Sequence, residues 1–380
     1  MSAFLHSKEL DSYVSAPICY GIVQTGEPQE EGVPAIEVKD IVDGKINEET
    51  IKKTTVAIDS EYKRSRLKTG DIVIAIRGTI GRVAIVPSSL NGANITRDVA
   101  RIRVDDPDKR DYIYFYLTSK VAEDHLRDNN IGQAVKGINI KDLKKLPIFI
   151  PEDKNEIKKL NSIFKTASKQ IEKQKHLIEA KEIQKKGLMQ KLLTGKTRFK
   201  DFTDKWKMLH LSKICDVKKG QQLNKLDLID DGIYPAINGG INPSGYTNNY
   251  NTEANTVTIS EGGNSCGYVN YITTKFWSGG HCYTLLNLKA NSYFVFQYLK
   301  LFENEIMKLR VGSGLPNIQK GSIDSFNINL PSVEEQNKIV EVLSLADNEI
   351  NVLRNQLSLF EEEKKGLMQK LFTGEVRVNV

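Results

Sequence analysis

The feature of this sequence that most constrains its fold is an internal repeat. The segment KKGLMQKL occurs at residues 185–192 and again at 364–371, so that Gly187 and Gly366 are 179 positions apart (366 − 187). Both copies continue to a Thr-Gly pair, at 194–195 and 373–374. A long repeat means that one structural unit is used twice, and it has to be recognised before any fold is assigned. We therefore expect a duplicated module.

The similarity extends upstream of this segment. LPIFIP at 146–151 matches FNINLP at 326–331, and the Pro-Ala-Ile at 34–36 parallels that at 235–237. GDIVIAIRGTIGRV at 70–83 parallels NTVTISEGGNSCGYV at 255–269, which places Glu261 to Ser265 where Arg77 to Thr79 lie in the first copy. Because the order is the same in both halves, we expect globular domains at 1–151 and 201–331, each followed by a helical region, at 152–200 and 332–380.

Each globular domain is expected to be strand-rich, with helices behind the strands. Short β-branched runs bounded by Gly, Pro or Asp predict strands at 72–76, 83–86, 99–104, 257–260 and 283–288. Aromatic stretches at 112–126 and 293–309 predict helices. The predicted fold class is α+β, with two repeated mixed α/β domains separated by two long helices.

The long helices are expected to pair with each other. In the second, apolar residues recur at heptad spacing from Leu343 to Leu371, interrupted by Lys364. The first has Gln174, Lys181 and Lys185 at the corresponding positions. Residues 154–200 hold 14 Lys/Arg against 4 Asp/Glu, whereas residues 332–380 hold 6 against 9. Opposite charge favours an antiparallel coiled coil about a pseudo-two-fold axis, about 54 Å long for roughly 36 residues.

The composition is that of a globular cytoplasmic protein. Hydrophobic residues make up 39% and charged residues 27% of the chain. No apolar run approaches the ~20 residues that cross a bilayer, and the N-terminus does not have the pattern of a signal peptide. The four cysteines lack Cys-x-x-Cys spacing, which favours a reducing cytosol over a zinc module or a disulfide framework.

Several short motifs resemble catalytic signatures but are better explained structurally. Thr194 to Thr197 resembles the end of a phosphate-binding loop, but Gln190 stands where the first Gly is needed, so a helix C-terminal turn is preferred. Asn242 to Gly245 is expected to be a turn, and Glu37 to Lys39 a strand end. The pair His281-Cys282 has no other His near it in the sequence, which favours a structural or base-contacting His over a metal ligand.

Two different sets of polar residues are candidates for contact with nucleic acid. The first module has balanced charge overall, with 22 Lys/Arg against 22 Asp/Glu in residues 1–151, but it carries a local group of basic residues. Two of its arginines flank the Gly-Thr-Ile-Gly loop at 78–81, where they could take phosphate or guanine; a solvated charged face is the alternative. The second module is rich in Asn, which pairs with adenine. The candidates are Lys63, Arg64, Arg66, Arg77, Thr79, Arg82, Arg97 and Lys136 in the first module, and Lys219, Gln221, Gln222, Asn238, Tyr246, Asn264, Ser265, His281 and Asn317 in the second.

Together these features resemble the specificity subunit of Type I restriction-modification systems. The resemblance rests on two domains each closed by a helix, a Leu-Pro-type strand, Glu335-Gln336 after the proline, the repeated KGLMQKL and Thr-Gly ending, and a domain opening at 206–220. Two departures are Asn155-Glu156-Ile157 in place of the first Glu-Gln pair, and an N-terminus without the Trp-containing opening.

The resemblance implies a prokaryotic, cytoplasmic protein without catalytic activity or metal. Each domain would read one half of a bipartite site in double-stranded DNA. The helices would hold two methyltransferase subunits and, through them, the restriction subunits. S-adenosylmethionine, ATP and Mg²⁺ would be bound by those partners and not by this chain.

Two other classes remain open from the residues alone. One is a stand-alone DNA-modifying enzyme, which would need an active-site constellation that the sequence does not display. The other is a repeated adaptor for protein or glycan, for which loops of Asn, Tyr and Gly would also serve. Salt-dependent DNA binding separates the adaptor from a DNA reader.

Overall fold

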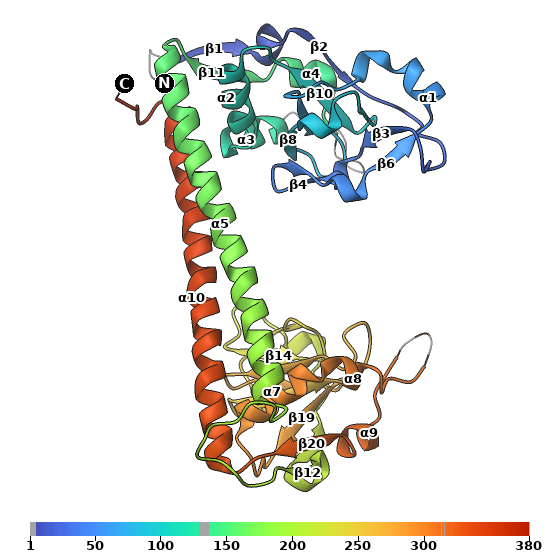
Figure 1. Ribbon diagram of the computed structural model, residues 1–380, viewed down its shortest axis with the longest axis vertical. Helices are drawn as coiled ribbons and strands as arrows, with labels where there is room; N and C mark the ends of the chain where they lie inside the picture. The colour runs from blue at the N-terminus through green and yellow to red at the C-terminus, as the bar shows by residue number, and fades with distance from the viewer. Residues whose placement is uncertain (1–4, 129–136, 313, 315, 380) are drawn as a thin grey trace. The chain divides into compact units, whose positions relative to one another are not determined.

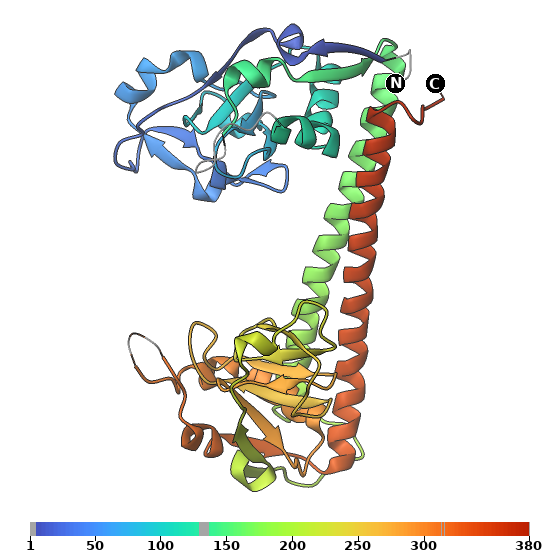
Figure 2. The same cartoon turned by 180° about the vertical axis from the view of Figure 1, so that it is seen from behind.

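The computed structural model describes residues 5–128, 137–312, 314 and 316–379 (Figures 1 and 2). Its contacts divide the chain into two compact units. Unit 1 comprises Met1–Lys175 together with Gln356–Val380, and unit 2 comprises His176–Asn355. Each unit thus holds one globular domain and one stretch of paired helix.

Unit 1 is built on a four-stranded antiparallel sheet of order β2-β10-β7-β8. A smaller sheet of order β6-β3-β9 contains one parallel pair, β3 with β9, and β1 pairs with β11. The strands are β1 (Leu5–Glu9), β2 (Ala16–Tyr20), β3 (Val33–Ile36), β4 (Ile41–Val42), β5 (Lys45–Ile46), β6 (Lys52–Thr54), β7 (Ile72–Ala75), β8 (Val83–Ile85), β9 (Asn94–Ile95), β10 (Val99–Arg103) and β11 (Pro147–Pro151). The short helices are α1 (Val56–Glu61), α2 (Pro107–Leu117), α3 (Lys120–Asp128) and α4 (Ile140–Lys144).

Unit 2 repeats these three sheets, and among the described residues it has no counterpart of the β4–β5 hairpin of unit 1. Its four-stranded sheet has the order β13-β19-β16-β17, its smaller sheet β15-β14-β18 again contains one parallel pair, and β12 pairs with β20. The strands are β12 (Lys207–His210), β13 (Asp216–Lys219), β14 (Tyr234–Ile237), β15 (Gly245–Thr247), β16 (Thr256–Ser260), β17 (Val269–Ile272), β18 (Trp277–Ser278), β19 (Cys282–Leu286) and β20 (Asn327–Leu330). The short helices are α6 (Leu211–Ile214), α7 (Ser292–Leu301), α8 (Glu303–Met307) and α9 (Lys320–Asp324).

The expected strands are present, but each aromatic helix is divided in two. The stretch predicted at 112–126 forms α2 and α3, and the stretch at 293–309 forms α7 and α8. In both copies an N-cap side chain begins the first helix: Asp106 accepts hydrogen bonds from two backbone N–H groups of α2, and Asn291 does the same for α7. The division lies at Thr118 and Ser119 in the first stretch, where the Ser119 hydroxyl accepts a hydrogen bond from the N–H of Ala122 in α3, and at Phe302 in the second.

Two long helices, α5 (Lys154–Leu192) and α10 (Val333–Phe372), run antiparallel to each other within each unit. In unit 1, Gln174 donates to Gln356 across 3.3 Å, and the rings of Phe164 and Phe372 lie 5.0 Å apart. In unit 2, Lys181 and Lys185 form ion pairs at 2.6 Å with Glu349 and Asp347. The predicted coiled coil of one basic and one acidic helix is confirmed. The polar residues of α5 that interrupt its apolar heptad pattern contact polar residues of α10.

The segment that resembled a phosphate-binding loop is a helix C-terminal turn. Gly195, just beyond α5, has φ = +70°, and Gly374, just beyond α10, has φ = +73°. The N–H groups of Gly195 and Thr197 donate to the carbonyls of Leu192 and Lys191, which satisfies the last turn of the helix. A left-handed conformation favours Gly, so the repeated Thr-Gly pair is explained by helix termination.

After each turn, an arginine returns to the start of the other long helix. Arg198 forms two hydrogen bonds with Glu335, at 2.8 and 2.7 Å, and Arg377 forms two with Glu156, at 3.1 and 2.5 Å. Glu156 therefore occupies the position of Glu335, and the buried Ile157 occupies that of Gln336. The first copy keeps the glutamate of the repeat and replaces only the glutamine.

Among the described residues, none of the helices combines the length and the apolar character that spanning a bilayer would require.

Candidate nucleic-acid interface

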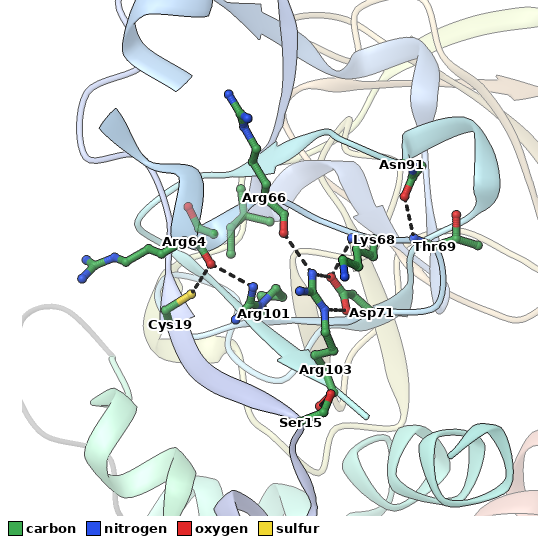
Figure 3. A network of polar contacts seen from close by, with 12 residues as sticks. Ser15, Cys19, Arg64, Arg66, Lys68, Thr69, Asp71, Asn91, Arg101 and Arg103 are labelled. Carbon is green, nitrogen blue, oxygen red and sulfur yellow. Dashed lines mark hydrogen bonds and ion pairs between the residues drawn. The ribbon is translucent and has the colours of Figure 1, made fainter. Parts of the chain in front are cut away.

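The basic segment 63–68 of unit 1 is held in place by two arginines behind it (Figure 3). Arg101, which is buried, donates from its guanidinium to the carbonyls of Arg64 and Pro17, each at 2.8 Å. Arg103 forms a bidentate pair with Asp71, at 2.7 and 2.6 Å, and also donates to the carbonyl of Arg66. The hydrogen bond that Arg103 donates to Asp71 raises the pKa of Arg103. Sequence reasoning did not single out Arg101 or Arg103, because nothing in their spacing distinguishes them from exposed arginines.

The anchored backbone exposes two of the three predicted cations in this segment. Lys63 and Arg64 are exposed, and the guanidinium of Arg64 lies 5.6 Å from the ring centre of Tyr20. Figure 3 shows the Arg64 side chain directed away from the Asp71 network. Arg66 is instead bound to the buried carboxylate of Asp59, and this hydrogen bond raises the pKa of Arg66. Lys63 and Arg64 are therefore better placed than Arg66 to meet an anionic ligand.

The loop after β7 brings Arg77 and Arg97 together. Both are exposed, and their guanidinium groups lie 3.7 and 3.6 Å from the same carboxylate, that of Asp98. Thr79 is exposed in the same loop. Arg82 is turned elsewhere, since its guanidinium donates to the carbonyl of Ile41 at 3.2 Å. Lys136, also a candidate, lies outside the described residues.

In unit 2, two of the predicted residues, Lys219 and His281, meet at Glu261, which was not among the candidates. Its carboxylate accepts from Lys219 Nζ at 2.5 Å, lies 3.3 Å from His281 Nδ1, and accepts from the Tyr283 hydroxyl at 3.4 Å. The backbone N–H of His281 donates to Asn238 Oδ1 at 3.1 Å. These contacts join β13, β14, β16 and β19 at one edge of the domain.

The neighbouring loops place several further candidates beside this cluster. Ser265 donates to the carbonyl of Gly239 at 2.7 Å, and Asn317 forms a backbone bridge with Gly262. Gln221 follows β13, and its N–H donates to the carbonyl of Ser278. The remaining candidates are exposed: Gln222 after β13, Asn264 in the loop after β16, and Tyr246 on β15 in the smaller sheet.

Backbone hydrogen bonds align the two domains residue by residue. The N–H of Ile76 donates to the carbonyl of Asp98, and the N–H of Glu261 donates to that of His281. Arg77 bridges Gly137 as Gly262 bridges Asn317. The structural counterpart of Arg77 is therefore Gly262, and Glu261 corresponds to Ile76, one residue away from the alignment expected from the sequence. The sequence could not settle this register because the second loop is one residue longer.

The same register identifies three further pairs of equivalent positions. Tyr20 pairs with Ala100 between β2 and β10 as Lys219 pairs with Tyr283 between β13 and β19. One scaffold thus presents different chemistry at four positions. The residues are Tyr20, Ile76, Asp98 and Ala100 in unit 1, and Lys219, Glu261, His281 and Tyr283 in unit 2.

The thiol beside His281 is not placed as a nucleophile. Cys282 is buried on β19, and burial raises its pKa to about 11, so the thiol stays protonated near neutral pH. Among the described residues, no group of three or more His, Cys, Asp or Glu side chains could hold a metal ion.

Comparison with known proteins places this arrangement in a family. The model of the Type I restriction modification DNA specificity domain matches twice, at residues 25–182 and 203–359. The specificity subunit of the EcoBI Type I restriction enzyme of Escherichia coli is 36% identical over 165 residues, which is 42% of this chain and 34% of that protein. The putative MjaX specificity subunit of Methanocaldococcus jannaschii is 26% identical over 403 aligned positions, covering 94% of this chain and 90% of that protein.

A solved structure shows the same fold. The S subunit of a Type I restriction-modification system from M. genitalium aligns with a TM-score of 0.61 at 19% identity, covering 97% of this chain and 96% of that chain. The first curated relatives are matched over a smaller part, since the aligned stretches span 34% to 46% of their lengths.

Proposed function

The chain belongs to the family of Type I restriction-modification DNA specificity domains, and from this we propose that it is a non-catalytic specificity subunit of such a system. Each globular domain binds one half of a bipartite site in double-stranded DNA. The paired helices hold two methyltransferase subunits in a prokaryotic cytoplasm, and restriction subunits join through them. Those partners bind S-adenosylmethionine, ATP and Mg²⁺.

The observation that carries this proposal is that the two units share one backbone framework but have different side chains at equivalent positions. At the four equivalent positions, unit 1 has Ile76 and Asp98 where unit 2 has Glu261 and His281. A domain duplicated for stability alone has no need of different charged groups at the same exposed edge. Base edges in the major groove present distinct donor and acceptor patterns, so readers of two different half-sites require different side chains on the same framework.

An apolar stripe on α10 supports the proposed contact with a partner subunit. Leu345 is 64% exposed and Val352 is 55% exposed, and they are seven residues apart on one face of the helix. Apolar residues repeating every seven positions form a seam that packs against another helix. Since α5 covers a different face of α10, this seam suits a helix of the methyltransferase.

Reconstitution tests the proposal as a whole. The purified chain should neither methylate nor cut DNA, and addition of the methyltransferase subunit should give S-adenosylmethionine-dependent methylation at one bipartite sequence. Exchange of residues 207–325 for those of another family member should change one half of that sequence and leave the other half intact. Turnover by the chain alone, or loss of both half-specificities on exchange, would refute the proposal.

Arg77 and Arg97 are expected to contribute electrostatically to DNA binding. Each phosphate contact releases about one counterion, so Arg77→Ala or Arg97→Ala should lower the slope of log K against log salt by about 1 and weaken binding to all sequences alike. Binding of the assembled complex is measured between about 50 and 200 mM salt. Lys338→Ala is the control, because Lys338 lies on α10 in an exposed pair with Glu341. Unchanged slopes in both arginine variants would exclude them from the interface.

A further inference from the structure

Glu261 is a charged residue at a position that the fold otherwise makes apolar. Its counterpart in unit 1, Ile76, is 2% exposed and belongs to the core of that domain. The Glu261 side chain is only 13% exposed. Placing a carboxylate there costs desolvation energy, and this is tolerated only where donors surround the charge. A scaffold that accepts Ile in one copy does not need the carboxylate for folding.

Lys219 and His281 flank this carboxylate. Lys219 on β13 lies 2.5 Å from Oε1, and His281 Nδ1, just before β19, lies 3.3 Å from Oε2. The Tyr283 hydroxyl lies 3.4 Å from Oε1, but its one hydrogen has a nearer acceptor in the carbonyl of Ile318 at 3.1 Å. Lys219 and His281 are exposed, at 49% and 63% of their side chains, whereas Glu261 lies beneath them. The Lys219 and His281 side chains therefore contact the largely buried Glu261 carboxylate on one side and face solvent on the other.

The Glu261 carboxylate determines the hydrogen-bonding role of the solvent-facing nitrogen of His281. A carboxylate can only accept hydrogen bonds, so Nδ1 must carry a hydrogen to pair with Glu261. In the neutral ring this leaves Nε2 as an acceptor. The major groove offers complementary donors in the amino groups of adenine N6 and cytosine N4, whereas the guanine edge offers two acceptors. Lys219 supplies a donor beside this acceptor.

We propose that Glu261 is the positioning residue of a base-reading site in the second domain, holding His281 Nε2 as an acceptor for an exocyclic amino group in the major groove and Lys219 as the neighbouring donor. The inference rests on the proposed function and makes it specific, because it identifies the chemical group recognised. Removal of the carboxylate should release both side chains and abolish discrimination at one base pair of the second half-site.

Two variants separate positioning from folding. Glu261→Gln keeps the shape but can accept from only one of the two neighbours and no longer carries charge. Glu261→Ile installs the residue of the equivalent position in unit 1, and it should fold at least as stably because an apolar group replaces a buried charge. The matched control is Glu303→Gln, which removes another partly buried domain-2 carboxylate, one that accepts from Lys300 Nζ at 2.6 Å and from Val269 N at 2.8 Å.

The experiment uses the chain assembled with its methyltransferase subunit, after its methylated sequence has been mapped. Competition binding is measured with duplexes in which each second-half adenine is replaced by purine, or each cytosine by 2-pyrimidinone, both of which lack the exocyclic amino group. At one position of the second half-site, the base analogue should lower the affinity of the wild-type complex roughly tenfold to a hundredfold. If that analogue is purine, the base recognised is adenine, and if it is 2-pyrimidinone, the base recognised is cytosine.

At that position, both Glu261 variants should bind the natural base and its analogue with affinities that differ by less than about threefold. In the first half-site they should discriminate between bases as the wild type does. ¹⁵N NMR of the His281 ring should show the Nδ1–H tautomer in the wild type and a mixture in Glu261→Ile. Wild-type discrimination by both Glu261 variants, or an equal loss in Glu303→Gln, would overturn the inference. A wild-type complex without sequence preference would instead overturn the proposed function itself.

Discussion

Replacement of Asp347 by Ala is expected to lower the free energy of unfolding of unit 2 by roughly 1–3 kcal/mol, the cost of leaving part-buried donors without their acceptor. Asp347 accepts from Lys185 Nζ at 2.6 Å, from the Tyr293 hydroxyl at 2.7 Å and from Gln297 Nε2 at 2.9 Å. Gln297 is fully buried, and the Lys185 side chain is 17% exposed. Burial, followed by the hydrogen bond to Asp347, raises the pKa of Tyr293. One substitution leaves three donors without their acceptor.

The measurement can be confined to unit 2. Both tryptophans of the chain, Trp206 and Trp277, lie there, so urea unfolding followed by tryptophan fluorescence reports on this unit. Glu341→Ala is the control on the same helix, because its pair with Lys338 is exposed and should contribute less than about 1 kcal/mol. If Asp347→Ala lowers the free energy of unfolding by less than about 1 kcal/mol, the hydrogen bonds that Asp347 accepts do not stabilise the unit.

The pairing of the two helices illustrates how far sequence reasoning reaches. Heptad spacing and opposite charge predicted the antiparallel pair, and Lys181 and Lys185 do meet acidic residues of α10. The spacing did not reveal that Asp347 also binds α7, because that contact depends on how the domain packs against the helix. Local periodicity reports which face of a helix is covered, and it contains no information on which distant side chains complete a polar cluster.

The candidate interface shows the same limit. The basic and Asn-rich loops were located from composition. The structure brings Arg77 and Arg97 to one carboxylate in unit 1, and Lys219 and His281 to one carboxylate in unit 2. Glu261 was missed because a single Glu after a strand is an ordinary surface residue in sequence, and only the backbone register equates it with the core residue Ile76. Arg101 and Arg103 were not separated from exposed cations, because burial of an arginine depends on acceptors that are distant in the sequence. These are the carbonyls of Arg64 and Pro17 for Arg101, and the carboxylate of Asp71 for Arg103.

Replacement of Glu335 by Ala should cost more than the loss of Asp347, roughly 3–5 kcal/mol in unit 2. Its side chain is 1% exposed and accepts two hydrogen bonds from Arg198 and one from Trp206 Nε1 at 3.1 Å. The Arg198 guanidinium also lies 5.9 Å from the Trp206 ring centre. Arg198 is only 23% exposed, so removal of Glu335 leaves a largely buried cation without its carboxylate.

The equivalent substitution in unit 1, Glu156→Ala, should cost less, although the hydrogen bonds look the same. Its partner Arg377 is 47% exposed, so water solvates the guanidinium once the carboxylate is removed. Calorimetry of the full chain with each variant compares the two. Arg198→Ala combined with Glu335→Ala should cost less than the sum of the single changes, because the double variant leaves no unpaired charge. Equal losses for Glu335→Ala and Glu156→Ala would mean that burial of the arginine does not determine the strength of this contact.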